Sequence, residues 1–323
     1  MPNQPPYVDP EMAALLPWDL AVGPETVDWV HFSENELHTM RAEAVEMRER
    51  SPRPGPDLPR VRDLELPIGS ERLRARLYEP LLSEALRPVI VYLHGGGWCM
   101  GGIEGLDGNC RVLAEYSRVN VLSIDYPLAP ESRFPEALNQ IIDACVWLRK
   151  HAGEWGIDAD RIALGGDSAG ANLALSTAMQ LRDAQQNFLK GLLLLYGVFA
   201  HDHDTASHRS FGRDERYTLS SAAMDFCWRM YLKDPAQDRD VRAAPLLGEL
   251  DHLPPCHLVC GSLDPLLDDS THLHEKLLAA GVASTLEVVP GVTHSFLSFF
   301  DKLQAARNAW RGAADFLKQS LNR

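Results

Sequence analysis

The sequence of 323 residues contains no long apolar run, and it has fewer basic than acidic residues. No segment approaches the roughly 18–20 apolar residues that a membrane-spanning helix needs. The N-terminus has no basic stretch followed by an apolar one, so no secretion signal is expected. With 31 Lys and Arg against 45 Asp and Glu, the net charge of −14 disfavours nucleic acid and anionic membranes as partners. We therefore expect a cytoplasmic protein that binds neither.

Cysteine pairs that would bind zinc or exchange electrons are also missing. The six cysteines are scattered and form no C-x-x-C pair, so we expect small buried side chains in a reducing compartment. The segment HDHD at 201–204, with His208 nearby, could be a metal cluster. Histidine and aspartate alternating on a loop are more often a solvated surface, however. We therefore predict neither a metal site nor a cofactor.

From about residue 88 onward, short apolar strands alternate with helical patterns. Apolar strands separated by helices are typical of a mostly parallel sheet covered on both faces. Two half-exposed strands, identified by their period-2 alternation, precede this series. The predicted α/β fold has eight strands, at 61–68, 71–80, 88–94, 119–126, 161–166, 189–199, 255–261 and 284–291. Helices are predicted at 33–50, 135–151, 169–185, 269–280 and 302–320.

A long irregular stretch, residues 200–250, interrupts this alternation. Insertions of this length between strands are usually functional or disordered. Trp228, Met230 and Tyr231 cluster in an amphipathic helical pattern within the insertion, which argues for an element that packs. We therefore predict that the insertion forms a lid.

The segment GDSAG at 166–170 ends a predicted strand and opens a predicted helix. This is the G-x-S-x-G pattern in the strand–turn–helix context where a tight turn exposes a nucleophilic serine. The alternative is that Ser168 only caps the helix, as serines often do. The strand before it and the helix after it favour Ser168 as the nucleophile.

A serine nucleophile needs a base that takes its proton and a carboxylate that orients the base. In this arrangement the acid and then the histidine follow the serine along the chain, each after a later strand. Asp264 stands just past one strand, and His294 stands on a turn after the last one. Asp268 could also reach the histidine, so the choice of Asp264 stays open to that alternative.

Three consecutive glycines, in HGGG at 94–97, follow the first parallel strand. Acyl transfer creates an oxyanion that needs backbone N–H groups aimed at it. Gly96, Gly97 and Ala169, the residue after the nucleophile, are the predicted donors, because no side chain at the glycines would block the oxygen. A phosphate loop is the weaker reading, since neither G-x-x-x-x-G-K-[ST] nor G-x-G-x-x-G occurs here.

The motifs HGGGW, DYPLAPESRFP, GDSAGANLA, GSLDPLLDD and GVTHSF occur in this order, and the chain from about residue 60 resembles the bacterial branch of the hormone-sensitive lipase family of α/β-hydrolases. The resemblance implies carboxylester hydrolysis with Ser168, Asp264 and His294 as triad. It also implies that His94 and Asp125 shape the oxyanion loop rather than react. The implied organisation is N-terminal cap helices and linker at 1–57, a catalytic domain at 58–199 and 251–323, and a cap insertion at 200–250.

The expected partner is a small ester, and a homodimer is left open. Five residues near the site are predicted to line a pocket for a short acyl chain: Trp98, Asp167, Tyr196, Phe211 and Phe296. The same machinery attacks amides, lactones and thioesters, and the sequence does not choose among these leaving groups. Similar folds also serve as receptors for small hydrophobic acids. Those receptors lack the histidine that is present here as His294.

Overall fold

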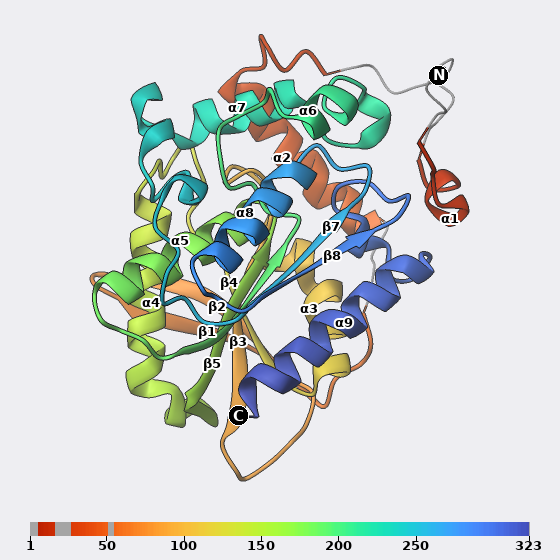
Figure 1. Cartoon of the computed structure of the whole chain (residues 1–323). Coiled ribbons are helices and arrows are strands. Elements are labelled where there is room, and N and C mark those ends of the chain that lie inside the picture. The colour runs from red at the N-terminus through yellow and green to blue at the C-terminus, as the bar shows by residue number, and fades with distance from the viewer. Residues whose placement is uncertain (1–5, 17–26, 51–54, 323) are drawn as a thin grey trace.

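The predicted strands pair into one sheet in the computed structural model of the chain, which describes residues 6–16, 27–50 and 55–322 (Figure 1). The strand order is β1-β2-β4-β3-β5-β6-β7-β8, and the pairs from β4 to β8 are parallel, whereas β1 and β2 are antiparallel to their neighbours. This confirms the predicted fold class. The strands are β1 (Arg60–Ile68), β2 (Glu71–Glu79), β3 (Arg87–Leu93), β4 (Asn120–Ile124), β5 (Ile157–Asp167), β6 (Leu189–Leu195), β7 (Cys256–Gly261) and β8 (Ser284–Val289).

Helices cover both faces of the sheet (Figure 1). On one face α3 (Ile103–Ser117) packs beside α9 (Gln304–Leu321). The other face carries α4 (Glu136–His151), α5 (Ala169–Asp183) and α8 (Leu267–Ala279). Among the helices of the described residues, none is long and apolar enough to cross a membrane.

The central strand β3 shows why both faces need a cover. Its residues after Arg87 are all buried, and successive side chains point to opposite sides. Val89, Val91 and Leu93 join the core beneath α4 and α5. Ile90 and Tyr92 join the second core beneath α3 and α9. A strand that is apolar on both faces is stable only when both faces are packed.

Helix α3 was not predicted from the sequence. Its 15 residues include Gly105 and Gly108, and each glycine disfavours a helix interior by about 1 kcal/mol relative to alanine. Tertiary packing outweighs this cost, because Cys110, Val112 and Leu113 are buried in the core on that face. The first turn of α3 directly follows the glycine-rich loop.

The segment between β6 and β7 contains α6 (Ala206–Phe211) and α7 (Ser221–Tyr231), and α2 (Glu34–Arg50) lies at the same end of the molecule (Figure 1). The guanidinium group of Arg229 in α7 donates to the carbonyl oxygens of Trp29 and Val30 at 3.0 and 3.2 Å. Phe226 meets Phe32 edge to face, with ring centroids 5.1 Å apart. The segment before α2 and the insertion therefore pack together.

The short helix α1 (Pro10–Ala13) contributes Met12 to the core on the α9 side. The predicted start of α2 is present, since Ser33 and Glu36 form the reciprocal capping contacts. The linker expected within 1–57 lies partly outside the described residues, which omit 51–54. The division of the chain into cap and catalytic parts stays a prediction.

Candidate active site

Ser168 stands in a sharp turn between the end of β5 and the start of α5. Its backbone has φ 52° and ψ −119°, a region that residues with a side chain rarely adopt. The turn is this tight because β3 lies directly against it: a Cβ at Gly166 or Gly170 would come within 2.4 or 2.0 Å of the Leu93 carbonyl oxygen. The Ser168 side chain makes no capping hydrogen bond to the helix, so the alternative role of a helix cap is not what the geometry shows.

A chain of two hydrogen bonds leads from Ser168 to a buried carboxylate. The Nε2 atom of His294 lies 3.1 Å from Ser168 Oγ, and its Nδ1 lies 2.8 Å from Asp264 Oδ2. A carboxylate accepts the proton-bearing Nδ1, which leaves Nε2 as the acceptor that faces the serine. Asp264 is fully buried, and Ser168 and His294 are each 7% exposed. The three residues come from the ends of β5, β7 and β8.

The other carboxylates near Asp264 are engaged elsewhere. Asp264 itself uses its second oxygen to accept the Leu266 N–H at 2.8 Å. Asp268 accepts the N–H of Ser207, at the start of α6, at 2.8 Å. Asp269 accepts the N–H of Phe199 just before the insertion, and burial raises the pKa of Asp269 to about 7. Of the two carboxylates left open by the sequence, Asp264 is the one that meets His294.

The glycine loop is closely packed by the protein itself. A Cβ at Gly96 would lie 2.2 Å from the Met100 carbonyl oxygen, and one at Gly97 would lie 2.3 Å from Cys227 Sγ in α7. Both residues also have positive φ, 122° and 57°. We expected bare glycines so that a substrate oxygen could approach; the structure adds that the loop's own turn and the insertion leave no room for a side chain.

Asp167 was expected to line the pocket, but its carboxylate is turned toward the glycine loop. Its Oδ1 accepts the Gly95 N–H at 3.0 Å and the Tyr92 hydroxyl at 3.1 Å. Only 5% of Asp167 is exposed, and burial raises its pKa to about 6. Asp167 thus ties the glycine loop to the turn that holds Ser168. The sequence shows a carboxylate directly before the nucleophile, but not the direction in which its side chain turns.

The aromatic residues expected around the pocket lie in three different places. Tyr196 and Phe296 are buried beside the base: the Tyr196 ring packs edge to face on His294 at 4.9 Å and on Phe296 at 6.1 Å. Trp98 is buried against the insertion and stacks on Tyr231 at 4.4 Å. Phe211 is half-buried in the insertion and packs edge to face on Tyr217 at 5.0 Å.

Sequence reasoning missed several residues of the insertion that reach the site. Thr218 Oγ1 lies 3.3 Å from the His294 carbonyl oxygen. Cys227 lies against Gly97, and its Sγ is 3.9 Å from Cys99 Sγ. These contacts join residues far apart in the chain, so no local pattern announces them.

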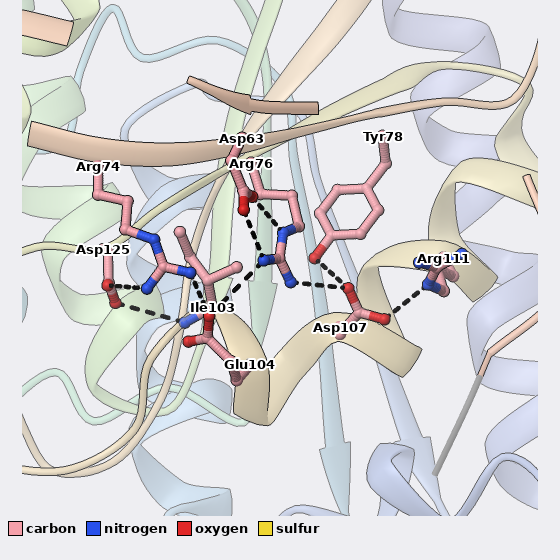
Figure 2. Close-up of polar contacts among 9 residues, drawn as sticks. All are labelled: Asp63, Arg74, Arg76, Tyr78, Ile103, Glu104, Asp107, Arg111 and Asp125. Carbon is pink, nitrogen blue, oxygen red and sulfur yellow. Dashed lines mark hydrogen bonds and ion pairs between the residues drawn. The ribbon is translucent and has the colours of Figure 1, made fainter. Parts of the chain in front are cut away.

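The far end of the glycine loop is braced by charged residues of β2 and α3, as Figure 2 shows. Asp125 accepts the N–H of Ile103, the first residue of α3, at 3.3 Å, and pairs with Arg74 at 3.3 Å. Arg74 also pairs with Glu104. At the near end, His94 bonds the Gly95 carbonyl oxygen through Nδ1 at 2.8 Å. These contacts support the implied role of His94 and Asp125 in shaping the loop.

Comparison with known proteins points to one group. A family model described as an alpha/beta hydrolase fold matches residues 90–298. An ester-hydrolase from the metagenome of Lake Arreo, solved with a derivative of bipyridine phosphonate, is 32% identical, covers 98% of this chain and 100% of its own, and has a TM-score of 0.89. EstE1, a thermophilic and thermostable carboxylesterase from a metagenomic library, is 35% identical over 90% of this chain and 99% of its own, with a TM-score of 0.85. The esterase of Pyrobaculum calidifontis is 29% identical over 97% and 98% of the two chains, with a TM-score of 0.86.

Proposed function

The chain belongs to the alpha/beta hydrolase fold family, and to its carboxylesterases of the hormone-sensitive lipase type, and from this premise we propose that it hydrolyses short-chain acyl esters through an acyl-enzyme on Ser168. The observation that carries the proposal is the hydrogen-bond chain from Ser168 through His294 to the buried Asp264. A serine, a base and an orienting carboxylate in hydrogen-bond contact are the requirements of nucleophilic acyl transfer.

In the first step, His294 Nε2 takes the proton of Ser168 while Oγ attacks the ester carbonyl carbon. The carbonyl oxygen becomes an oxyanion, to which the N–H groups of Gly96, Gly97 and Ala169 donate. The intermediate then collapses, the C–O bond to the alcohol breaks, and the alcohol leaves with the proton held on Nε2. Water repeats the sequence on the acyl-enzyme and releases the acid.

Asp264 holds the His294 ring in this sequence. Its carboxylate accepts the Nδ1–H at 2.8 Å, which fixes the tautomer with Nε2 free to act as base. It also stabilises the imidazolium that forms during attack, and this attraction is strong because Asp264 is fully buried.

The surroundings of the serine support a preference for short acyl chains. Tyr196 and Phe296 pack around the base, and Trp98 is fixed against Tyr231 beside the glycine loop. A short chain gains about 0.8 kcal/mol per buried CH₂ until the available space is filled. Each further carbon must displace a packed side chain. We propose an optimum of kcat/KM at about two to six acyl carbons, with a steep decline by about twelve.

The test uses a series of aryl esters of increasing acyl length, assayed with the native protein and with Ser168→Ala. We expect kcat to fall by about 10⁴–10⁶-fold, while thermal stability changes little, because only one hydroxyl is lost. An organophosphonate should label the native protein on Ser168, and peptide mass spectrometry identifies the site. Label on a different serine, or an active Ser168→Ala protein, would overturn the assignment.

A matched pair of Asp→Asn variants tests which carboxylate orients His294. Asp264→Asn should lower kcat by about 10⁴-fold with little change in KM, since the histidine is then held in the wrong tautomer. Asp268→Asn is the control, because its carboxylate contacts Ser207 instead of His294. A larger loss in Asp268→Asn would exchange the two roles.

A further inference from the structure

Outside the active site, three side chains that suit a metal ion converge in the insertion. His201 and His203 precede α6, and Asp225 lies in α7, 24 residues after His201. Two ring nitrogens approach one carboxylate oxygen, Asp225 Oδ1: His203 Nδ1 at 2.9 Å and His201 Nε2 at 3.5 Å. Together the three ligand atoms lie within 4.8 Å of one another.

The distances between these ligand atoms match those expected between two ligands of one bound ion. Zinc binds histidine nitrogen and carboxylate oxygen at about 2.0–2.2 Å, so two of its ligands at tetrahedral angles lie about 3.3 Å apart. The separations of 2.9 and 3.5 Å bracket this value. The third distance, between the two ring nitrogens, lies within 4.8 Å, and His201 is an exposed residue.

The histidines are also held by their surroundings. His201 Nδ1 lies 3.3 Å from Asp238 Oδ2, and its ring stacks on Trp228 at 5.0 Å. With the Nδ1 proton donated to Asp238, the Nε2 lone pair is free for an ion, which is the usual arrangement of a carboxylate behind a metal-binding histidine. The ring of His203 packs on His208 at 4.7 Å.

The burial of His203 distinguishes this cluster from histidines and aspartates on a solvated surface loop. Its side chain is only 14% exposed, and its Nε2 is buried with no hydrogen-bond partner among the described residues. Among the described residues, the hydrogen-bond partner of this ring is Asp225 alone.

We propose that His201, His203 and Asp225 form a binding site for a divalent cation of the zinc type, completed by water. Two imidazoles and one carboxylate suit Zn²⁺, Co²⁺ or Ni²⁺ better than Mg²⁺ or Ca²⁺, which prefer oxygen ligands. The ion would join the segment after β6 to α7, which packs on the glycine loop through Cys227 and Trp228. Its role is structural, and it does not depend on the proposed esterase mechanism.

The test is zinc binding by the full-length protein without an affinity tag. After treatment with a chelator and dialysis, calorimetric titration with ZnCl₂ should give one equivalent of bound ion in the native protein. His201→Ala and Asp225→Asn should abolish this binding. Asp238→Asn should weaken it by about 10-fold, as loss of a carboxylate behind a metal-binding histidine does.

His252→Ala is the matched control, because His252 is an exposed histidine outside the cluster, and it should keep the full stoichiometry. Bound Co²⁺ should give the visible absorption of a four-coordinate site in the native protein and in His252→Ala, but not in His201→Ala or Asp225→Asn. Zinc at a hundredfold excess over Kd should raise Tm by about 3 °C, and not in Asp225→Asn. The proposal would be overturned if the native protein bound no zinc, or if His201→Ala and Asp225→Asn still bound one equivalent. The three side chains would then only hydrogen-bond to one another.

Discussion

The loop between β3 and α3, residues 94–102, contains the three glycines, and its two ends are held by different kinds of interaction. Toward the insertion, Trp98 stacks on Tyr231 and tilts against Trp228 at 4.7 Å, and all three side chains are about 1% exposed. Toward β2, the contacts are ion pairs between half-exposed side chains, with Arg74 at 43% and Glu104 at 52% exposure (Figure 2).

This difference indicates which end sets the shape of the loop. Buried aromatic contacts are insensitive to salt and are lost only when the side chains separate. Exposed ion pairs contribute about 0–1 kcal/mol each and weaken as salt screens them. The insertion therefore contributes more than the charged cluster to holding the proposed oxyanion donors, so folding of the insertion and catalysis should be coupled.

The largest effect is expected for Gly97→Ala. The new Cβ would meet Cys227 Sγ at 2.3 Å, and the backbone there has a positive φ of 57°. We expect kcat to fall by about 10²–10³-fold, the loss typical of one missing oxyanion donor, together with a lower Tm. Steady-state kinetics on a short aryl ester and a thermal melt measure both.

Gly153→Ala is the control, since its Cβ would meet nothing within 4 Å and its φ is not positive. Adding Cys227→Ala to Gly97→Ala removes the closest contact and should restore part of the stability. Equal effects at Gly97 and Gly153 would mean that the insertion does not constrain the loop.

How much could be predicted from the sequence depends on how far apart in the chain the interacting residues lie. The turn at Ser168 and the glycine loop are encoded in a few adjacent residues, so their place in the fold could be found. His294 was found from strand order, whereas Asp264 and Asp268 stand too close in sequence to be separated without coordinates. The contact of Cys227 with Gly97 joins residues 130 positions apart, and the role of Asp167 depends on which way its side chain turns. Neither leaves a local pattern.

The aromatic contact can be tested alone with a pair of variants at Tyr231. Tyr231→Ala removes the ring that stacks on Trp98 and should cost about 3–5 kcal/mol of unfolding free energy. Tyr231→Phe keeps the ring and removes a hydroxyl that is buried without a partner among the described residues, so stability should change little. Denaturant titration measures both. A similar loss in the two variants would assign the stabilisation to the hydroxyl group.

The root of the insertion carries a buried carboxylate and predicts a pH dependence. Asp269 accepts the N–H groups of Phe199 and Ala200, and burial raises its pKa to about 7. An acid whose pKa is higher in the folded than in the unfolded state costs stability as pH rises from about 4 to about 7. Asp269→Asn removes this titration while an amide oxygen can still accept both N–H groups.

The stability of Asp269→Asn relative to the native protein should therefore rise by up to about 4 kcal/mol between pH 4 and pH 8. Urea titrations at several pH values measure the difference. Asp143→Asn, at an exposed aspartate of α4, should give a curve parallel to that of the native protein. If the stability of Asp269→Asn relative to the native protein fell as the pH rose, folding would lower the pKa of Asp269 instead of raising it.

The smallest effect is expected at the charged end of the loop. Glu104→Gln removes the ion pairs with Arg74 and Arg76 but keeps a polar side chain at the start of α3. We expect a loss of about 0.5 kcal/mol at low salt, because both partners of the Arg74 pair are half-exposed. At 1 M NaCl the screening length is about 3 Å, and the difference from the native protein should vanish. The Tyr231→Ala loss should persist in the same salt. A Glu104→Gln loss as large as that of Tyr231→Ala, unchanged by salt, would mean that the charged end and not the insertion holds the loop.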